Sequence, residues 1–325
     1  MKLLVTGGAG YIGSATAQLL IEEGHEVVVL DNLYTGHREA LPDGAAFAEA
    51  DLLDVATVRD IFRTHRPEGV LHFAALSLVG ESMQDPGKYF YTNVTGAVNL
   101  LEAMREAGTR LIIFSSTAAV YGAPETMPIT ETTPTAPTNP YGESKLMIEK
   151  LLRWYHEIHG IRWVALRYFN ACGAVEGRGE DHEPETHLIP LLLLTALGKR
   201  KIFKVFGDDY PTPDGTCIRD YIHIHDLARA HVLALEEKAV GAYNLGTTTG
   251  NSVKEVLEAA EKVIGKPIPH EIAPRRPGDP PALVAEHARI TKELGWEPKC
   301  STLEEIIGSA WAWHSSHPDG YATKS

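Results

Sequence analysis

Over its first 170 residues the sequence alternates short apolar runs with longer segments of helical periodicity. The runs are KLLVT, HEVVVL, AAFAEAD, GVLHFAA, RLIIFSS and IRWVALRY, and the longer segments between them include 11–23, 54–65, 86–107 and 140–159. Strands and helices that alternate in this way form a parallel sheet with helices on both faces. The near-continuous Val, Ile and Leu are typical of strands buried on both sides. The sequence therefore predicts a doubly wound α/β domain over residues 1–170.

The pattern changes after residue 170. AVEGRGEDHEPETH is polar and contains Gly and Pro, and the HLIPLLLLTALG that follows it is predicted to form an amphipathic helix. We therefore expect a smaller α/β domain over 171–325. CIRDYIH and AYNLG are strand-like, so segments near 216–247 are predicted to return to the first domain.

Charge and composition exclude several classes of protein. Acidic residues outnumber basic ones by 43 to 30, which gives a net charge of −13, and no block of Lys and Arg is dense enough for a nucleic acid backbone. MKLLVTGGAG lacks the apolar core of a signal peptide, and no apolar run reaches membrane-spanning length. Cys172, Cys217 and Cys300 are widely separated, so neither a disulfide framework nor a zinc knuckle is indicated. We expect a cytoplasmic protein with no nucleic acid or membrane partner.

TGGAGYIGS, residues 6–14, lies directly between the first predicted strand and the first predicted helix. Gly7, Gly10 and Gly13 let backbone amides approach a pyrophosphate, and the N-terminus of the helix adds its positive dipole. Asp31 ends the second strand, where a carboxylate accepts both ribose hydroxyls and repels the 2'-phosphate of NADP. No arginine follows Asp31 that could bind that phosphate. Together these features predict a Rossmann-type domain that binds NAD.

PYGESK places Tyr141 and Lys145 on one face of a helix, because residues four apart lie one turn from each other. A neighbouring ammonium and a nicotinamide cation both favour the phenolate, which makes Tyr141 a usable general base. The motif alone is common by chance, but a strand that ends in Ser115, Ser116 and Thr117 stands 24 residues upstream. Ligands bind beyond the C-terminal ends of parallel strands, so we expect Thr117 to reach the same substrate oxygen as Tyr141.

With these motifs in this order, the sequence resembles the extended short-chain dehydrogenase/reductases, and within them it closely resembles the UDP-glucose 4-epimerase family. The resemblance runs through nearly the whole chain. It is carried by TGGAGYIGS, DNLYTG, FAALSLVGES, SSTAAVYG, PYGESKLMIE, RYFNACGA, FGDDYPTPDGTCIRDYIH, YNLGTTTGNSV and APRRPGDPPAL. Several of these segments lie in the second half, so the resemblance implies that 171–325 binds a nucleotide sugar.

The resemblance also implies residue roles. Tyr141 acts as the base, Thr117 relays its proton, and Lys145 holds the nicotinamide ribose. The residues implied to contact NAD are Gly7, Gly10, Tyr11, Ile12, Gly13, Asp31, Asn32, Gly36, Asp51, Leu52, Phe73, Ala74, Ala75, Ser77, Thr92, Tyr141, Lys145 and Phe169. Those implied to contact a UDP-sugar are Thr117, Tyr141, Asn170, His187, Leu188, Phe206, Arg219, Tyr221, Arg276, Asp279 and Leu283. Ser77 stands where the family sometimes has Lys, and Thr92 and His187 stand where Asn is frequent, which puts these three contacts in doubt.

The activity implied is the interconversion of UDP-galactose and UDP-glucose through a transient 4-keto sugar. The alternatives are a 4-epimerase of another UDP-sugar (an N-acetylhexosamine, a pentose or a uronic acid), a sugar-nucleotide 4,6-dehydratase or decarboxylase, and a non-catalytic NAD-binding regulator. A dehydratase needs a proton donor in reach of the substrate, and its family supplies acids directly after the Thr at the end of the strand. Here that position is followed by Ala118 and Ala119.

Three further expectations follow. His223, His225 and Asp226, with His231 beyond, have the spacing of a metal site, but RDYIHIHD matches a segment of the resembled family that holds no metal, so we expect none. Leu283 is smaller than the Tyr of strict hexose enzymes, which implies some tolerance of N-acetylated sugars. The resemblance also implies a homodimer that pairs helices near 86–107 and 140–159.

Overall fold

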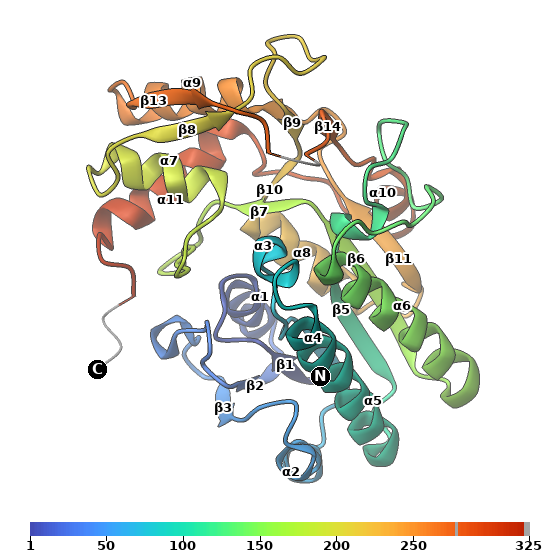
Figure 1. The fold of residues 1–325 in the computed structure, drawn as a ribbon. Helices are drawn as coiled ribbons and strands as arrows, with labels where there is room; N and C mark the ends of the chain where they lie inside the picture. Colours follow the sequence, from blue (N-terminus) through green and yellow to red (C-terminus); the bar gives the residue numbers. More distant parts are fainter. Residues whose placement is uncertain (277–278, 322–325) are drawn as a thin grey trace.

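A seven-stranded, wholly parallel sheet forms the centre of the first half of the chain in the computed structural model, which describes residues 1–276 and 279–321 (Figure 1). The order is β11-β6-β5-β4-β1-β2-β3, so the direction of strand addition reverses at β1. The strands are β1 (Lys2–Thr6), β2 (Glu26–Asp31), β3 (Ala46–Glu49), β4 (Gly69–His72), β5 (Leu111–Thr117), β6 (Arg162–Tyr168) and β11 (Gly241–Leu245). The predicted doubly wound α/β fold is confirmed.

Strands β1, β2, β4, β5 and β6 are largely buried on both faces, which explains their continuous apolar character, whereas the edge strand β3 is partly exposed. In β1, Leu3 and Val5 belong to one apolar cluster and Leu4 to another, because successive side chains of a strand point to opposite faces. The cluster that contains Leu3 packs on α1 (Tyr11–Glu22), α8 (Ile224–Leu233) and α10 (Ala288–Leu294). The other packs on α2 (Val55–His65), α5 (Gly96–Ala107) and α6 (Pro140–His159). Helices thus cover both faces of the sheet.

The segment before α5 is helical in short pieces. It comprises α3 (Val79–Ser82), α4 (Pro86–Tyr89) and a π-helical stretch, Phe90–Thr95, that runs directly into α5. Single π-helical turns inside helices are frequent at functional sites. Thr92, in this stretch, faces the cleft described below.

The second half of the chain builds a smaller mixed α/β layer, drawn above the large sheet in Figure 1. Its helices are α7 (Leu188–Ala196), α9 (Val253–Ile264) and α11 (Leu303–Ser316), and they share one apolar core. Its short strands pair as β7 (Asn170–Cys172) with β10 (Tyr221–His223), β8 (Phe203–Phe206) with β13 (His270–Ala273), and β12 (Asn251–Ser252) with β9 (Ile218–Arg219) and β14 (Ala282–Leu283).

The two strand-like segments expected to return to the first domain behave differently. AYNLG supplies β11, which pairs in parallel with β6 at the edge of the large sheet. CIRDYIH supplies β9 and β10, which pair in two small sheets instead. The predicted division at residue 170 stays a proposal, and 277–278 and 322–325 of the second predicted domain lie outside the described residues.

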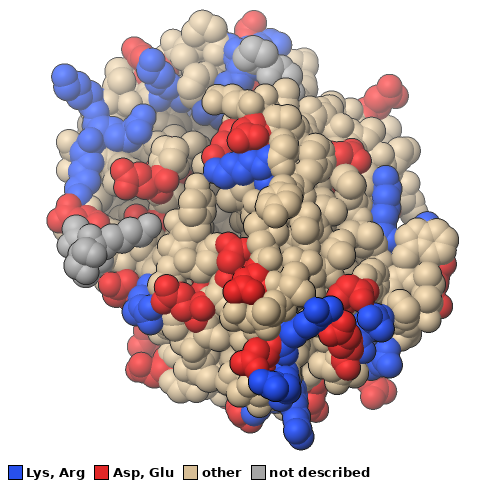
Figure 2. All heavy atoms as spheres, turned by 60° about the horizontal axis from the view of Figure 1, so that its bottom comes forward, with Lys and Arg blue, Asp and Glu red and all other residues tan. Residues whose placement is uncertain are grey.

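The surface shows no single dominant sign of charge on the face seen in Figure 2, where basic and acidic side chains are interspersed. Such mixing gives that face no uniform positive field to attract a phosphate backbone. Within the described ranges, no helix combines the length and the apolar character needed to cross a membrane.

Candidate active site

One large cleft lies beyond the C-terminal ends of the parallel strands and is closed from above by the second half of the chain. Its volume is about 1690 Å³, whereas a pocket for one small ligand usually has roughly 300–1,000 Å³. The cleft is therefore large enough for two ligands. It also lies at the reversal of strand order between β1 and β4, which is where ligands bind in open α/β sheets.

All residues predicted from the sequence to bind ligands line this single cleft. The first group surrounds the β1–α1 turn and the ends of β2, β4 and β5, and comprises Gly7, Gly10, Tyr11, Ile12, Gly13, Asp31, Asn32, Gly36, Asp51, Leu52, Phe73, Ala74, Ala75, Ser77, Thr92, Tyr141, Lys145 and Phe169. The second faces it and comprises Thr117, Asn170, His187, Leu188, Phe206, Arg219, Tyr221, Arg276, Asp279 and Leu283. Their placement is observed, and their individual roles stay proposals.

The β1–α1 turn is tightly packed and leaves the start of α1 open. A Cβ added at Gly13 would lie 2.1 Å from the carbonyl oxygen of Gly7, so no larger residue fits there. Gly10 precedes α1 and no side chain caps the helix, so its first backbone N–H groups are available to an anion. The turn thus fits the pyrophosphate of a dinucleotide.

Asp31 is fixed at the end of β2, beside this turn. Its carboxylate accepts hydrogen bonds from the backbone N–H of Ala9 at 3.0 Å and of Leu33 at 2.8 Å. Burial raises the pKa of Asp31, and these hydrogen bonds oppose the rise. An ionised carboxylate has about four acceptor positions, so two remain for a ribose. Asn32 Nδ2 donates to Asp51 at 2.8 Å and continues this wall of the cleft.

Close packing of α6 on the end of β5 brings Tyr141 to Thr117. A Cβ at Gly142 would lie 2.6 Å from the carbonyl oxygen of Ala119, in the 3-10 turn Ala118–Tyr121 that follows β5. Asn139 caps α6 by accepting from the N–H of Gly142 at 2.8 Å. Thr117 and Tyr141 are thus placed close enough for the Thr117 hydroxyl to lower the pKa of the phenol.

Burial governs the ionisation of Tyr141 and Lys145. It raises the pKa of Tyr141, which the Thr117 hydroxyl partly offsets, and it lowers the pKa of Lys145 to about 7. Lys145 Nζ donates to the carbonyl of Ser115 at 3.0 Å and lies 5.9 Å from the centroid of the Tyr141 ring. A cation bound close to the phenol would lower its pKa. Burial thus favours the neutral form of Tyr141, and a bound cation would favour the phenolate.

The opposite end of the cleft presents fixed cations. Arg219 forms an ion pair with Asp279, and the guanidinium carbon of Arg276 lies 4.1 Å from the centroid of the Phe206 ring. Leu283 is next to Arg219 across the β14–β9 pair. Arginines of this kind suit a diphosphate, and Phe206 provides a flat apolar surface for a base.

Glu180, His182 and Glu185 are among the cleft residues that the sequence analysis did not single out. They lie in AVEGRGEDHEPETH, whose Gly and Pro suggested only a connection between domains. The available signal was the alternation of carboxylates with imidazoles at 180, 182, 185 and 187.

The H-x-H-D segment does not converge on one centre as its spacing suggested. His223 Nε2 is hydrogen-bonded to Ser309 Oγ at 2.9 Å, whereas burial lowers the pKa of His231 to about 4. His225 and Asp226 approach Cys300 instead. Asp226 Oδ2 already accepts two backbone N–H groups and a serine hydroxyl, so its role is to hold the chain that follows α10.

Comparison with known proteins places the chain among sugar-nucleotide enzymes. The NAD dependent epimerase/dehydratase family matches residues 3–246. The UDP-glucose 4-epimerase of Halalkalibacterium halodurans is 54% identical over 331 residues, which cover 100% of this chain and 99% of that protein. A crystal structure of a UDP-glucose 4-epimerase superimposes with a TM-score of 0.97 at 51% identity, covering 99% of this chain and 100% of the other. The enzyme from Bifidobacterium longum, in complex with NAD⁺ and UDP, gives a TM-score of 0.93 at 40% identity, with 99% and 100% covered.

Proposed function

The chain belongs to the NAD dependent epimerase/dehydratase family, and from that premise we propose that it interconverts UDP-galactose and UDP-glucose with NAD as a retained cofactor. One observation supports this most strongly. A single cleft joins an anion-binding glycine turn to an arginine-lined pocket, and Tyr141 and Thr117 stand between them. The enzyme is an isomerase, because the hydride removed from the sugar is returned to it.

The protein's residues supply the acid–base part of the reaction. NAD, when bound, would supply the acceptor for the hydride at C4 of the sugar and the donor that returns it to the other face. Tyr141 takes the proton of the 4-hydroxyl and later returns one, and the hydroxyl of Thr117 orients the phenol oxygen. Lys145 holds the ribose beside the nicotinamide, and its charge favours the phenolate.

The pocket in the second half of the chain explains why the sugar can turn over. Arg219 and Arg276 are proposed to hold the diphosphate, Asp279 the uridine ribose and Phe206 the base. Binding energy concentrated on the nucleotide leaves the 4-keto sugar free to rotate about its link to the diphosphate. We propose that 171–325 is the nucleotide-sugar domain for this reason.

Ala118 and Ala119 weigh against a dehydratase. Both line the cleft directly after Thr117, and neither can protonate a leaving hydroxyl. Because there is no acid at these positions to drive elimination, we expect the 4-keto sugar to be reduced again.

The test uses purified protein with UDP-galactose and no added cofactor, followed by separation of the nucleotide sugars. UDP-glucose is the expected product, and Tyr141→Phe, which keeps the ring but removes the acidic hydroxyl, should slow its formation by roughly 10²–10⁴-fold. A 4-keto-6-deoxy product, or no UDP-glucose at all, contradicts the proposal. A second arm with UDP-N-acetylglucosamine tests Leu283, and no turnover there rejects only the proposed tolerance of N-acetyl groups.

We further propose that the protein is a cytoplasmic homodimer. Free thiols at Cys172, Cys217 and Cys300 agree with a reducing compartment. Large apolar side chains are exposed on α3, on the π-helical stretch, on α6 and just after α3, and a cluster of this kind commonly marks an interface. They are Val79, Met83, Tyr91, Met147, Trp154 and Ile158.

A further inference from the structure

Four metal-ligating side chains meet in the loop between β7 and α7. Glu180, His182, Glu185 and His187 each offer one ligand atom, and these atoms all lie within 4.8 Å of one another. Glu180 and Glu185 have side chains that are only 5% and 8% exposed. The cluster forms part of the wall of the large cleft.

The spacing of the ligand atoms is that of a small coordination shell. His187 Nδ1 lies 2.9 Å from Glu180 Oε1 and 3.0 Å from Glu185 Oε1. His182 Nδ1 lies 3.4 Å from Glu180 Oε1 and 3.8 Å from Glu185 Oε2. Donors about 2.0–2.2 Å from a tetrahedral zinc ion are roughly 3.3–3.6 Å from each other. Because the two imidazoles approach different oxygens of Glu185, one ion at the centre of the cluster would take one of these oxygens, and the shorter contacts of His187 would have to lengthen.

Hydrogen bonding within the protein accounts for only part of the cluster: Glu185 Oε1 accepts from the backbone N–H groups of Thr186 and His187 and lies 3.0 Å from His187 Nδ1. His187 Nδ1 carries at most one hydrogen, so it can donate fully to only one of the two carboxylates. His182 Nδ1 is enclosed and makes no hydrogen bond to any described residue. No lysine or arginine in the described part of the chain pairs with Glu180 or Glu185. The carboxylates raise the pKa of His182 and of His187 against the effect of burial, so two imidazolium ions can compensate the two buried carboxylates. A divalent cation would supply the same charge while using all four side chains as ligands.

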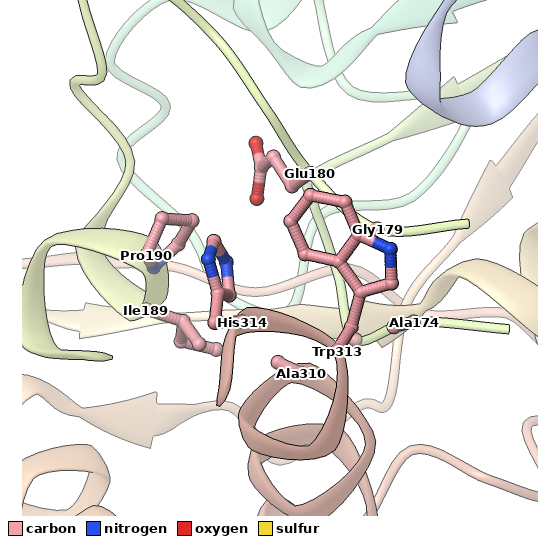
Figure 3. Close-up of a pocket in the computed structure, with 9 residues that line it drawn as sticks. Ala174, Gly179, Glu180, Ile189, Pro190, Ala310, Trp313 and His314 are labelled. Atoms are coloured by element: carbon pink, nitrogen blue, oxygen red, sulfur yellow. The ribbon is translucent and has the colours of Figure 1, made fainter. Parts of the chain in front are cut away.

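The surroundings of the cluster suit a closed structural site. Glu180 stands beside a recess walled by Trp313 and His314 of α11 and by Pro190 of α7 (Figure 3). On the other side, the His182 ring meets the Tyr11 ring edge-on, with 6.4 Å between centroids. Tyr11 begins α1 directly after the glycine turn, and His187 directly precedes α7. An ion here would connect the cofactor turn to the nucleotide-sugar side of the cleft.

We propose that Glu180, His182, Glu185 and His187 bind one zinc-class divalent ion in a four-coordinate shell of two imidazole nitrogens and two carboxylate oxygens. Imidazole and carboxylate ligands in a four-coordinate shell are typical of Zn²⁺. Four protein ligands leave no open position, so the ion fixes the 174–187 loop and takes no part in proton or hydride transfer. Coordination through Nδ1 leaves Nε2 of His187 for the substrate contact proposed above. The site goes beyond the proposed epimerisation.

The test measures metal binding directly. Tag-free protein is stripped with a chelator and dialysed, then titrated with Co²⁺ and with Zn²⁺, and the bound metal is measured by elemental analysis. We expect one ion per chain, a visible absorption typical of four-coordinate Co²⁺, and a melting temperature that rises with Zn²⁺ concentration.

Three variants locate the site. Glu180→Gln and His182→Asn each remove one ligand with little change of shape, and each should weaken binding by more than the roughly 10–100-fold that loss of an outer-shell partner costs. His225→Asn, in the group with Asp226 and Cys300, is the matched control and should bind one ion as tightly as the unaltered protein. Circular dichroism checks that each variant is folded. The proposal is overturned if the unaltered protein binds no ion, if both ligand variants bind normally, or if His225→Asn loses the ion.

Discussion

Lys145 is 2% exposed, and its ammonium contacts the carbonyl of Ser115 and lies 4.9 Å from the centroid of the Phe114 ring. No carboxylate is among the causes of its pKa shift, and burial alone lowers the pKa to about 7. The protein around Lys145 therefore compensates the ammonium poorly, and hydroxyl groups of a bound ribose would give it further acceptors. A buried charge that is poorly compensated reduces the stability of the folded protein.

Replacing Lys145 tests whether its buried charge lowers the stability of the protein, through the pH dependence of that stability. Lys145→Met removes the charge at similar length, and both proteins are compared free of nucleotide. The pKa in the folded protein, about 7, lies below the unfolded value of about 10.4, so the unfolded state binds more protons between these pH values. The unaltered protein therefore gains stability as the pH rises through this window.

The expected result is a higher melting temperature for Lys145→Met, with a gap to the unaltered protein that is widest below about pH 7 and closes as the pH approaches 10. Scanning calorimetry across that range measures it, and epimerase activity should fall at the same time. A gap that does not change with pH would show that the charge of Lys145 is not its source.

At the scale of elements, a buried network fastens α6 to the strands that carry the site. Arg167 of β6 forms a bidentate ion pair with Glu149 of α6, and Glu149 accepts from Ser116 of β5 at 2.5 Å. Arg167 also donates to the hydroxyl of Tyr121 at 2.8 Å. The side chains of Arg167 and Glu149 are only 8% and 5% exposed. The network fixes the position of α6, and hence of Tyr141, relative to Thr117.

Glu149→Ala should lower the free energy of unfolding by about 3–5 kcal/mol, because it leaves the charge of Arg167 buried without its partner. Urea denaturation followed by circular dichroism measures the loss. Glu157→Ala on the same helix is the control, since Glu157 pairs with Arg153 at 3.7 Å where both side chains are more than half exposed. That change should cost no more than about 0.5 kcal/mol. Equal losses in the two variants would refute the role of the network.

The sequence allowed the large sheet and the placement of the Tyr141–Lys145 pair to be predicted because both depend on local periodicity. Strands buried on two faces need continuous apolar residues, and a helix brings positions 141 and 145 to one side. The pairing of CIRDYIH could not be read in the same way, because β9 and β10 are two and three residues long and their partners lie far along the chain.

The residues that line the walls of the cleft could not be predicted from periodicity, because tertiary contacts bring them together. Arg219 and Asp279 are 60 residues apart and meet only through tertiary structure, so the resemblance to a family indicated them and spacing did not. Glu180 and His187 lie in a loop with no regular structure between Gly179 and the start of α7. Their convergence depends on how that loop packs against Tyr11 and α11, which local propensity does not determine.

At the scale of the whole molecule, we predict that two copies of the chain assemble into a dimer. Met147, Trp154 and Ile158 project from one side of α6, since they are spaced by seven and four residues, and their exposed fractions are 37%, 51% and 67%. Tyr91, 62% exposed in the π-helical stretch that packs on α6, adds to the apolar surface. A second copy of the chain would bury these side chains.

Light scattering after size exclusion should therefore give the mass of a dimer for the unaltered protein and of a monomer for Trp154→Glu combined with Ile158→Glu. Both positions are exposed in the single chain, so the substitutions leave its core intact and should change the stability of the monomer by no more than about 0.5 kcal/mol each. Ile272→Glu on β13, where the native side chain is 53% exposed, is the matched control and should stay dimeric. A monomeric unaltered protein, or a double variant that remains a dimer, would contradict an interface on α6, because charged side chains at the centre of an apolar contact prevent its closure.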